Sequence, residues 1–264
     1  MVKKVLFILI ILIIGRSGYC QKNIPGNSLF TEILSEYVKN GLVDYKNLKN
    51  DSRLNEYIDQ LSKTDPNDFK NIDDIKAFWI NVYNAYTLKF IIEEYPVESI
   101  NDLHWGGLYL GTVLGTTVWD DDKIVINEMN LSLNNVEHDT LRKAIGDERV
   151  HFALVCASIS CPNLRNEAYE GFKLDEQLDE EARKFFNDST KNRFDQKSKT
   201  AYLSKILDWY DDDFGNNRRE ILEYVVRHLR EDLAKEIIAN IDEWQIDYFD
   251  YNWNLNDSNL ESQN

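Results

Sequence analysis

The chain has 264 residues, of which 43% are hydrophobic and 29% charged, with only four Pro and eleven Gly. This composition excludes a collagen-like, low-complexity or disordered protein and provides enough apolar side chains for one domain of ordinary enzyme size. With 46 acidic and 30 basic residues the formal net charge is -16. Such a surface repels phosphate backbones, so we do not expect nucleic-acid binding.

Residues 1–20 follow the order of a secretory signal peptide. Two lysines precede the apolar run 5–14, and a small, polar stretch then leads to Cys20. The run is too short to span a membrane comfortably. We therefore predict cleavage before Gln21 and an exported protein without a membrane span, located in the periplasm or cell envelope or secreted. The alternative is a lipid-modified Cys20, as in bacterial lipoproteins, but Tyr19 stands where a small residue is expected.

Helical patterns dominate the N-terminal part of the chain. In two segments of 21–64 apolar residues recur at helical spacing, which predicts helices packed on the core. The strongest pattern runs from about Asp73 to Tyr95 and stops at Pro96, because proline disfavours helix in the residue before it. Apolar residues extend nearly all the way round this helix, so we expect it to be long, central and buried.

The second half of the chain mixes short β patterns with further helices. The expected elements are a hairpin of 116–119 and 123–126, a helix from Ser132 to Lys143, a short buried strand over 150–156, and helices over 174–186, 221–229 and 233–241. The last ordered piece should be 246–253, with 257–264 a disordered tail. The class predicted is α+β, a mostly helical single domain packed around a small β-sheet.

Two asparagines interrupt the apolar stripe of the predicted central helix. Asn81 and Asn84 lie one turn apart among apolar neighbours, and a buried carboxamide needs partners for its donors and its acceptor. Either both side chains bond neighbouring loop backbone and fix the core, or Asn84 orients a catalytic imidazole and Asn81 lines a pocket.

Cys156 and Cys161 are the only cysteines beyond the predicted leader. Cys161 precedes Pro162, which is favoured in the first turn of a helix. A Cys161 at such an N-cap would have a lowered pKa and could act as a nucleophile. Cys156 better fits a small buried apolar residue, and in a strand His151 would point to the opposite face from it. In an exported protein a Cys156–Cys161 disulfide is the third option.

A Glu-His pair supplies further candidate groups. Glu137 falls on an apolar helical stripe, beside His138, where its carboxylate could act as a general base or orient one. The alternative is an ion pair with an arginine, of which Arg142 lies closest in the chain. Neither CxxC nor HExxH spacing occurs, so we expect no metal site and no cofactor. The acidic run Asp211–Asp213 is most simply a solvated turn.

Several blocks together resemble the family called domain of unknown function 547 (DUF547). They are Ala77–Ala85, which includes Trp79; Val136–His138 with Leu141 and Arg142; His151–Cys156 with Ser160–Pro162; Trp209 and Tyr210 with Asp213–Gly215; and Tyr251–Asn256. The resemblance implies a family domain over about 65–256 and assigns no reaction. It also implies that seven candidates fall in family blocks: Asn81, Asn84, Glu137, His138, His151, Cys156 and Cys161. Trp79 and Arg142, also in these blocks, are expected to support the site.

These residues lead to two functional hypotheses. The first is a cysteine-dependent hydrolase or acyl/amide transferase acting on a cell-envelope substrate, with Cys161 as nucleophile. His138 or His151 would serve as its base, and Asn84 or Glu137 would orient that base. The second is a non-catalytic module that binds glycan or peptide through aromatics such as Trp105, Trp119 and Trp253 and carries a Cys156–Cys161 disulfide.

Overall fold

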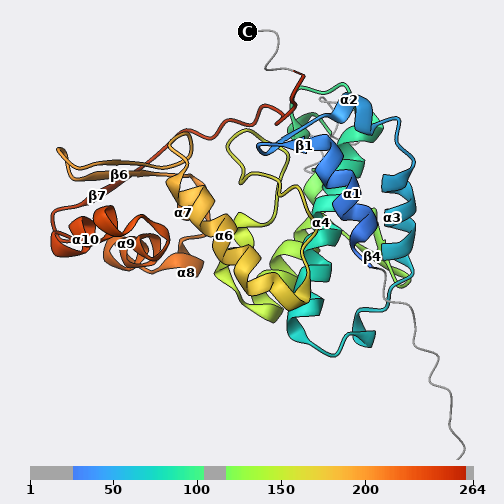
Figure 1. The fold of residues 1–264 in the computed structure, drawn as a ribbon, viewed down its shortest axis with the longest axis horizontal. Coiled ribbons are helices and arrows are strands. Elements are labelled where there is room, and N and C mark those ends of the chain that lie inside the picture. The colour runs from blue at the N-terminus through green and yellow to red at the C-terminus, as the bar shows by residue number, and fades with distance from the viewer. Residues whose placement is uncertain (1–25, 104–116, 260–264) are drawn as a thin grey trace, which may run out of the picture.

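The computed structural model describes residues 26–103 and 117–259, and its ribbon is drawn in Figure 1. The predicted signal peptide and Trp105 lie outside the described residues. Within the described part, none of the helices combines the length and apolar character needed to cross a membrane. Helices dominate and the strands are short, which confirms the predicted α+β, mostly helical class.

The described elements have the following bounds. The α-helices are α1 (Ser28–Tyr37), α2 (Tyr45–Leu48), α3 (Arg53–Ser62), α4 (Ile72–Glu94), α6 (Leu174–Asn187), α7 (Ile206–Trp209), α8 (Asp211–Phe214), α9 (Arg218–Val225) and α10 (Glu231–Ala239). Two further helices matter for the site: the π-helix η4 (Asn135–Ile145) and the 3₁₀-helix η5 (Glu148–Phe152). The other 3₁₀-helices are η1 (Pro66–Asp68), η2 (Ile100–Asp102), η3 (Val118–Asp120), η6 (Gly171–Lys173) and η7 (Val226–His228).

The strands form three separate small sheets in the described residues, where one was expected. β1 (Val38–Lys39) pairs with β2 (Leu42–Val43), and β3 (Ile124–Ile126) pairs with β4 (Met129–Leu131), both antiparallel. The third sheet has the order β5 (Arg193–Asp195), β6 (Thr200–Leu203), β7 (Gln245–Tyr248). In it β6 pairs antiparallel with β5 and parallel with β7.

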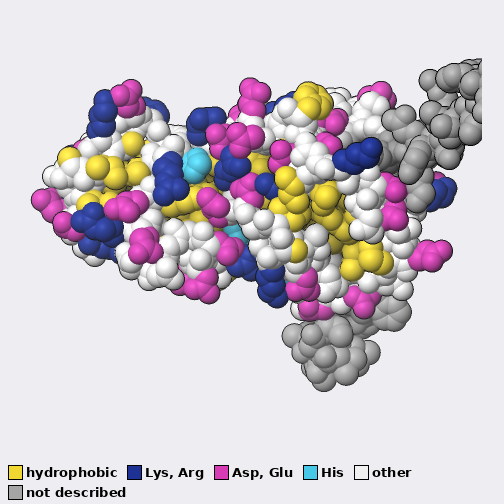
Figure 2. Space-filling view, turned by 90° about the horizontal axis from the view of Figure 1, so that it is seen from below, with side chains coloured by type: hydrophobic (Ala, Val, Ile, Leu, Met, Phe, Trp, Pro, Cys, Tyr) yellow, Lys and Arg dark blue, Asp and Glu magenta, His cyan; other side chains and the backbone are white. Residues whose placement is uncertain are grey.

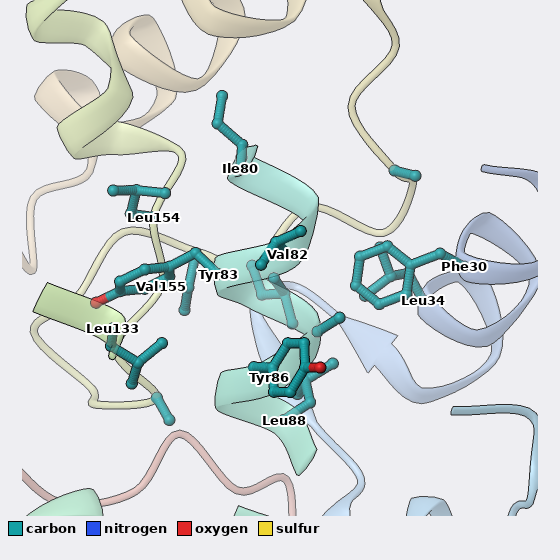
Figure 3. Packing of buried hydrophobic residues seen from close by; sticks show 14 of the residues in the cluster. Phe30, Leu34, Ile80, Val82, Tyr83, Tyr86, Leu88, Leu133, Leu154 and Val155 are labelled. Atoms are coloured by element: carbon teal, nitrogen blue, oxygen red, sulfur yellow. The ribbon is translucent and has the colours of Figure 1, made fainter. Parts of the chain in front are cut away.

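Helix α4 is the centre of the larger hydrophobic core, as predicted. The side chain of Asn71 caps its first turn by accepting a hydrogen bond from the backbone N–H of Asp73, at 2.9 Å. Apolar residues contact neighbours on all its sides: in Figure 3, Phe30 and Leu34 of α1 lie on one side and Leu133 and Leu154 on the other. The all-round apolar pattern was therefore a reliable sign of a buried helix.

The buried apolar side chains of residues 26–103 and 117–259 form two clusters rather than one. The larger cluster surrounds α4 and contains α1 to α3, and the smaller one is built from α9, α10 and the third sheet. Helix α6 spans both, because Leu174 and Leu178 belong to the larger cluster and Phe185 and Phe186 to the smaller. Figure 1 shows these two parts on either side of α6 and α7.

The segment after β7 returns from the smaller cluster to the larger one, as Figure 1 shows in red. The backbone N–H of Leu255 donates to the carbonyl of Glu98 at 2.7 Å, and that of Asn256 donates to Ala157 at 3.0 Å. Asp257 is buried and accepts a hydrogen bond from the Tyr95 hydroxyl at 2.7 Å. The predicted disordered tail is therefore wrong for Asp257–Asn259, while 260–264 lie outside the described residues.

The predicted hairpin is wrong in register. Residues 118–120 form a 3₁₀-helix, and the hairpin joins β3 to β4 instead. Its two-residue turn, Asn127-Glu128, has both φ angles positive, at 45° and 66°. Such a turn matches the twist of paired strands, but Glu is not a residue whose presence signals positive φ.

The predicted strand over 150–156 is also wrong. The carboxylate of Asp147 accepts a hydrogen bond from the backbone N–H of Arg149 at 3.1 Å and starts the 3₁₀-helix η5. Beyond Phe152 the chain is irregular up to Cys156, and the N–H of Val155 bonds a side chain of α4 rather than a strand. A short apolar run cannot by itself distinguish a buried strand from other buried backbone.

Candidate functional site

A cavity of about 300 Å³ lies where the two hydrophobic clusters meet. Its walls come from α4, η4, η5, the segment after η5, α7 and the C-terminal segment. The lining residues in the described part of the chain are Tyr83, Thr117, Trp119, Asn134, Glu137, His151, Leu154, Cys156, Cys161, Ile206, Trp209, Tyr210, Tyr251 and Trp253. Both cysteines, one histidine and one carboxylate from the candidate list therefore meet in a single cavity.

Cys156 is half-buried at the cavity wall and is surrounded by hydrogen-bond donors. Its Sγ lies 2.8 Å from Sγ of Cys161, 3.1 Å from the hydroxyl of Tyr251 and 3.3 Å from Oγ of Ser158. The hydrogen bond from the Cys161 thiol contributes most to lowering the pKa of Cys156 to about 7, against the opposing effect of burial. The thiolate is thus favoured on Cys156.

The backbone turns sharply directly after this cysteine. Ala157 has a φ of 58°, in the left-handed region that residues with a Cβ rarely adopt. Hydrogen bonding by the backbone of Ser158 is a further contribution to the lowered pKa of Cys156. Strained backbone of this kind concentrates at functional sites.

Cys161 has the opposite environment. It is buried, and its Sγ accepts a hydrogen bond from the backbone N–H of Cys156 at 2.8 Å. Burial, together with the hydrogen bond to Cys156, raises the pKa of the Cys161 thiol. The expected helix at Pro162 does not form, so the predicted N-cap is wrong. The fixed φ of proline suits extended backbone as well as a helix start. Both cysteines are free thiols here.

His151 is buried and bonded to a carboxylate that had been interpreted as part of a solvated turn. Its Nε2 lies 2.6 Å from Oδ2 of Asp213 on α8. Nε of Arg142 donates to the same oxygen at 2.6 Å. Hydrogen bonds from His151 and Arg142 hold the pKa of Asp213 well below its usual range. Asp213 is thus a candidate that sequence analysis did not single out, although Asp213–Gly215 is one of the pieces that resemble the family.

Tyr210 links this charged cluster to Glu137. Its ring centroid lies 4.3 Å from that of His151, and the guanidinium carbon of Arg142 lies 4.5 Å from it. Burial and then the charge and hydrogen bonding of the Glu137 carboxylate raise the pKa of the Tyr210 hydroxyl. Glu137 itself is 9% exposed and lines the cavity.

Both candidate asparagines bond backbone rather than a histidine. The Asn84 carboxamide donates to the carbonyl of Ala153 and accepts from the N–H of Val155, each at 2.9 Å. Asn81 forms the same pair of bonds with both backbone groups of Tyr169. Asn84 thereby fixes the segment that ends in Cys156, but with its donor and acceptor so bonded it does not orient the imidazole.

The remaining candidates lie outside the cavity lining. Nδ1 of His138 is bonded to Nη1 of Arg142 at 2.9 Å, so it is linked to the cluster through that arginine. Trp79 is buried in the larger cluster, with its ring 5.2 Å from that of Phe78. Among 26–103 and 117–259, no three His, Cys, Asp or Glu side chains are grouped so as to hold a metal ion.

The comparisons with known proteins agree with the resemblance carried by the sequence blocks. Residues 68–186 match the family model described as "Protein of unknown function, DUF547". No curated protein and no solved structure matches the chain. The matched range contains Glu137, His151 and both cysteines, while Asp213 and Tyr251 lie beyond it. The chain therefore contains a DUF547 domain over residues 68–186.

Proposed function

We propose that the protein is a cysteine-dependent hydrolase or acyl/amide transferase in which Cys156 is the nucleophile. One observation carries this proposal. The Cys156 thiol, whose pKa is lowered to about 7, and the His151 imidazole, which is bonded to Asp213, line the same cavity. A pKa near the working pH provides substantial thiolate without removing its nucleophilicity.

The proposed reaction begins with attack of the Cys156 thiolate on an ester or amide carbonyl. The new C–S bond replaces the C–O or C–N bond, and the leaving group takes a proton from His151. Water, or an acceptor alcohol or amine, then gives its proton to His151 and attacks the thioester. This second step releases the acyl product and restores the thiolate.

Asp213 supports the imidazole in this scheme. Because its carboxylate oxygen accepts from Nε2, the proton of the neutral imidazole is placed on that nitrogen and Nδ1 is left as the basic one. The charge of Asp213 also stabilises the imidazolium that forms when His151 is protonated. Arg142 and Tyr210 hold the two partners in place through the contacts described above.

Cys161, which the sequence analysis expected to be the nucleophile, has a supporting role in this proposal. Its buried thiol has a raised pKa, and its Sγ lies 2.8 Å from Sγ of Cys156. We therefore propose that it stabilises the attacking thiolate and does not itself attack the substrate. The predicted signal peptide supports an exported location, and we propose the cell envelope as the place of action.

Alkylation by iodoacetamide tests the nucleophile directly. Across about pH 5.5 to 9.5, the rate should rise with a midpoint near 7, and peptide mass mapping should place the label on Cys156. Cys156→Ala should remove the label, while Cys161→Ala should retain it. A midpoint near the ordinary value of about 8.5, or a label on Cys161 alone, would refute the assignment.

A further inference from the structure

The Glu137 carboxylate stands in the cavity without a basic partner. Only 9% of the residue is exposed, and within 26–103 and 117–259 no lysine or arginine forms an ion pair with it. Its polar partner there is the hydroxyl of Tyr210. The nearby Arg142 is already bonded to Asp213 and His138. Buried carboxylates are normally paired with a cation.

Two other largely buried carboxylates in the same protein follow that rule. Glu181 accepts from Arg165 at 2.5 Å, and Asp147 is bonded by both Lys76 and Arg149. The Glu137 carboxylate, in contrast, has no cationic partner among the described residues. Because it lines the cavity, a cationic ligand can reach it.

The other walls of the cavity are suited to a positive charge. Among the described residues, six aromatic side chains line it: Tyr83, Trp119, Trp209, Tyr210, Tyr251 and Trp253. Trp209 is 44% exposed, and its ring lies 4.7 Å from that of Tyr251 and 5.7 Å from that of Trp253. Aromatic faces attract ammonium groups through the ring quadrupole, and the attraction grows when water is excluded.

No lysine or arginine is found among the described lining residues, so a phosphate or carboxylate would meet neither of these cations there. The surface beyond adds to this preference. The net charge is -16, and acidic side chains are spread over the face drawn in Figure 2 rather than gathered in one patch. Such a field draws cations toward the molecule.

We propose that this cavity selects substrates bearing an ammonium group, which Glu137 and the surrounding aromatic rings bind beside the Cys156 thiol. The inference rests on the proposed function, and it names the substrate class as an ester or amide whose acyl or leaving part is cationic. The cavity volume of about 300 Å³ limits the bound part to a small group such as a trimethylammonium with its acyl neighbour.

Two probes of matched shape test the ammonium site. Choline and 3,3-dimethyl-1-butanol differ in the charge of one central atom, and three tryptophans of the cavity can report binding by fluorescence. Choline should bind at least about tenfold more tightly than its neutral counterpart. Glu137→Gln should remove most of that preference while leaving the affinity for the neutral alcohol unchanged.

Two further variants separate the site from the general charge of the protein. Glu176→Gln removes one exposed carboxylate on α6 and should change neither affinity. Trp209→Ala removes a half-exposed ring of the cavity wall and should weaken choline binding several-fold in the folded variant. Equal binding of the two probes, or a choline preference that survives Glu137→Gln in a folded protein, would overturn the inference.

Hydrolysis separates this inference from the function on which it rests. Acetylcholine should be cleaved faster than 3,3-dimethylbutyl acetate, and the difference should disappear in Glu137→Gln. Equal cleavage of both esters by a Cys156-dependent route would retain the enzyme and reject the ammonium site. Tight choline binding, with neither ester cleaved and no cysteine alkylated near neutral pH, would retain the ammonium site and reject the enzyme.

Discussion

Two clusters of charged side chains in this protein use similar residues in different ways. The Arg165 cluster consists of Arg165, Glu167, Lys173, Glu180 and Glu181. Arg165 bonds all three glutamates at 2.5–2.8 Å, and Lys173 bonds Glu167 at 2.8 Å. The His151 cluster consists of His151, Asp213, Arg142, His138 and Tyr210, and it borders a cavity that also contains a thiol and an unpaired carboxylate.

The difference lies in what each cluster leaves unsatisfied. In the Arg165 cluster each carboxylate has a cation, and none of the five residues lines the cavity that contains Cys156. In the His151 cluster one carboxylate serves both a histidine and an arginine, while Glu137 and the Cys156 thiol stay open to the cavity. Perturbed pKa values occur in both clusters, so a shift alone does not identify a site. The cavity beside the His151 cluster is the feature that distinguishes a candidate site from a structural cluster.

The strongest test exchanges one carboxylate in each cluster for an amide. Asp213→Asn should slow acylation of Cys156 by an activated ester roughly 10²–10⁴-fold, because the imidazole loses the charge that orients and stabilises it. Glu167→Gln should leave that rate within about twofold. Burst kinetics with p-nitrophenyl acetate measure both, and an unaltered rate in Asp213→Asn would mean that the two clusters are equally structural.

The second test measures how much the Arg165 cluster contributes to the stability of the folded protein. Salt-bridging groups lower the pKa of Glu167 from 4.5 to about 2. A carboxylate whose pKa is lower in the folded protein adds stability above its unfolded value of about 4.5. That stability disappears as the pH falls from about 4.5 toward 2.

Glu167→Gln should therefore lower the free energy of unfolding by about 1–3 kcal/mol at neutral pH and flatten its decline in acid. Urea unfolding at several pH values measures this effect. Asp213→Asn should lower stability at neutral pH as well, because the Asp213 side chain is no more exposed than that of Glu167 and its pKa is also held well below its usual range. If Glu167→Gln had the same free energy of unfolding as the unmodified protein at every pH, the Arg165 cluster would not be structural.

Features that depend on neighbouring residues in the chain could be predicted from the sequence, and contacts between distant residues could not. The central helix and its two asparagines were found because helical periodicity and an interrupted apolar stripe are local features. The bonding of Asn84 to Ala153 and Val155 is not local, since those residues are 69 and 71 positions away. Sequence could state that the carboxamide needs partners but could not name them.

The surroundings of Asp213 and Cys156 could not be predicted, for the same reason. Asp213 stands in an acidic run that resembles a solvated turn, and only the packing of α8 against η5 brings it to His151, 62 positions away. Cys156 follows an apolar run typical of buried residues. Its lowered pKa depends first on Cys161, then on Ser158, and also on Tyr251, which lies 95 positions further along. No periodicity carries either piece of information.

A third prediction concerns the coupling between the two thiols. Cys161→Ala removes the donor that contributes most to the lowered pKa of Cys156. The midpoint of alkylation should therefore move from about 7 toward the ordinary value of about 8.5. Cys161→Ser retains a hydroxyl donor, so its alkylation midpoint should lie between those of the unmodified protein and Cys161→Ala. Identical midpoints in all three proteins would show that the thiols do not interact.

The smallest expected effect belongs to Tyr251, which connects Cys156 to the C-terminal segment. Its hydroxyl lies 3.1 Å from Sγ of Cys156 and accepts from Oγ of Ser158 at 3.0 Å. Because Tyr251 contributes less than Cys161 or Ser158 to the lowered pKa, Tyr251→Phe should raise the alkylation midpoint by roughly half a unit. The ring itself remains, so its packing against Trp209 and Trp253 should be unchanged.

Tyr248→Phe is the matched control, since it removes a tyrosine hydroxyl from β7, outside the residues that line the cavity. Its midpoint should equal that of the unmodified protein. A shift in Tyr251→Phe as large as that in Cys161→Ala would place the main support of the thiolate in the C-terminal segment. Because this segment lies beyond the matched range 68–186, the reactivity of Cys156 would then depend chiefly on residues outside the family match.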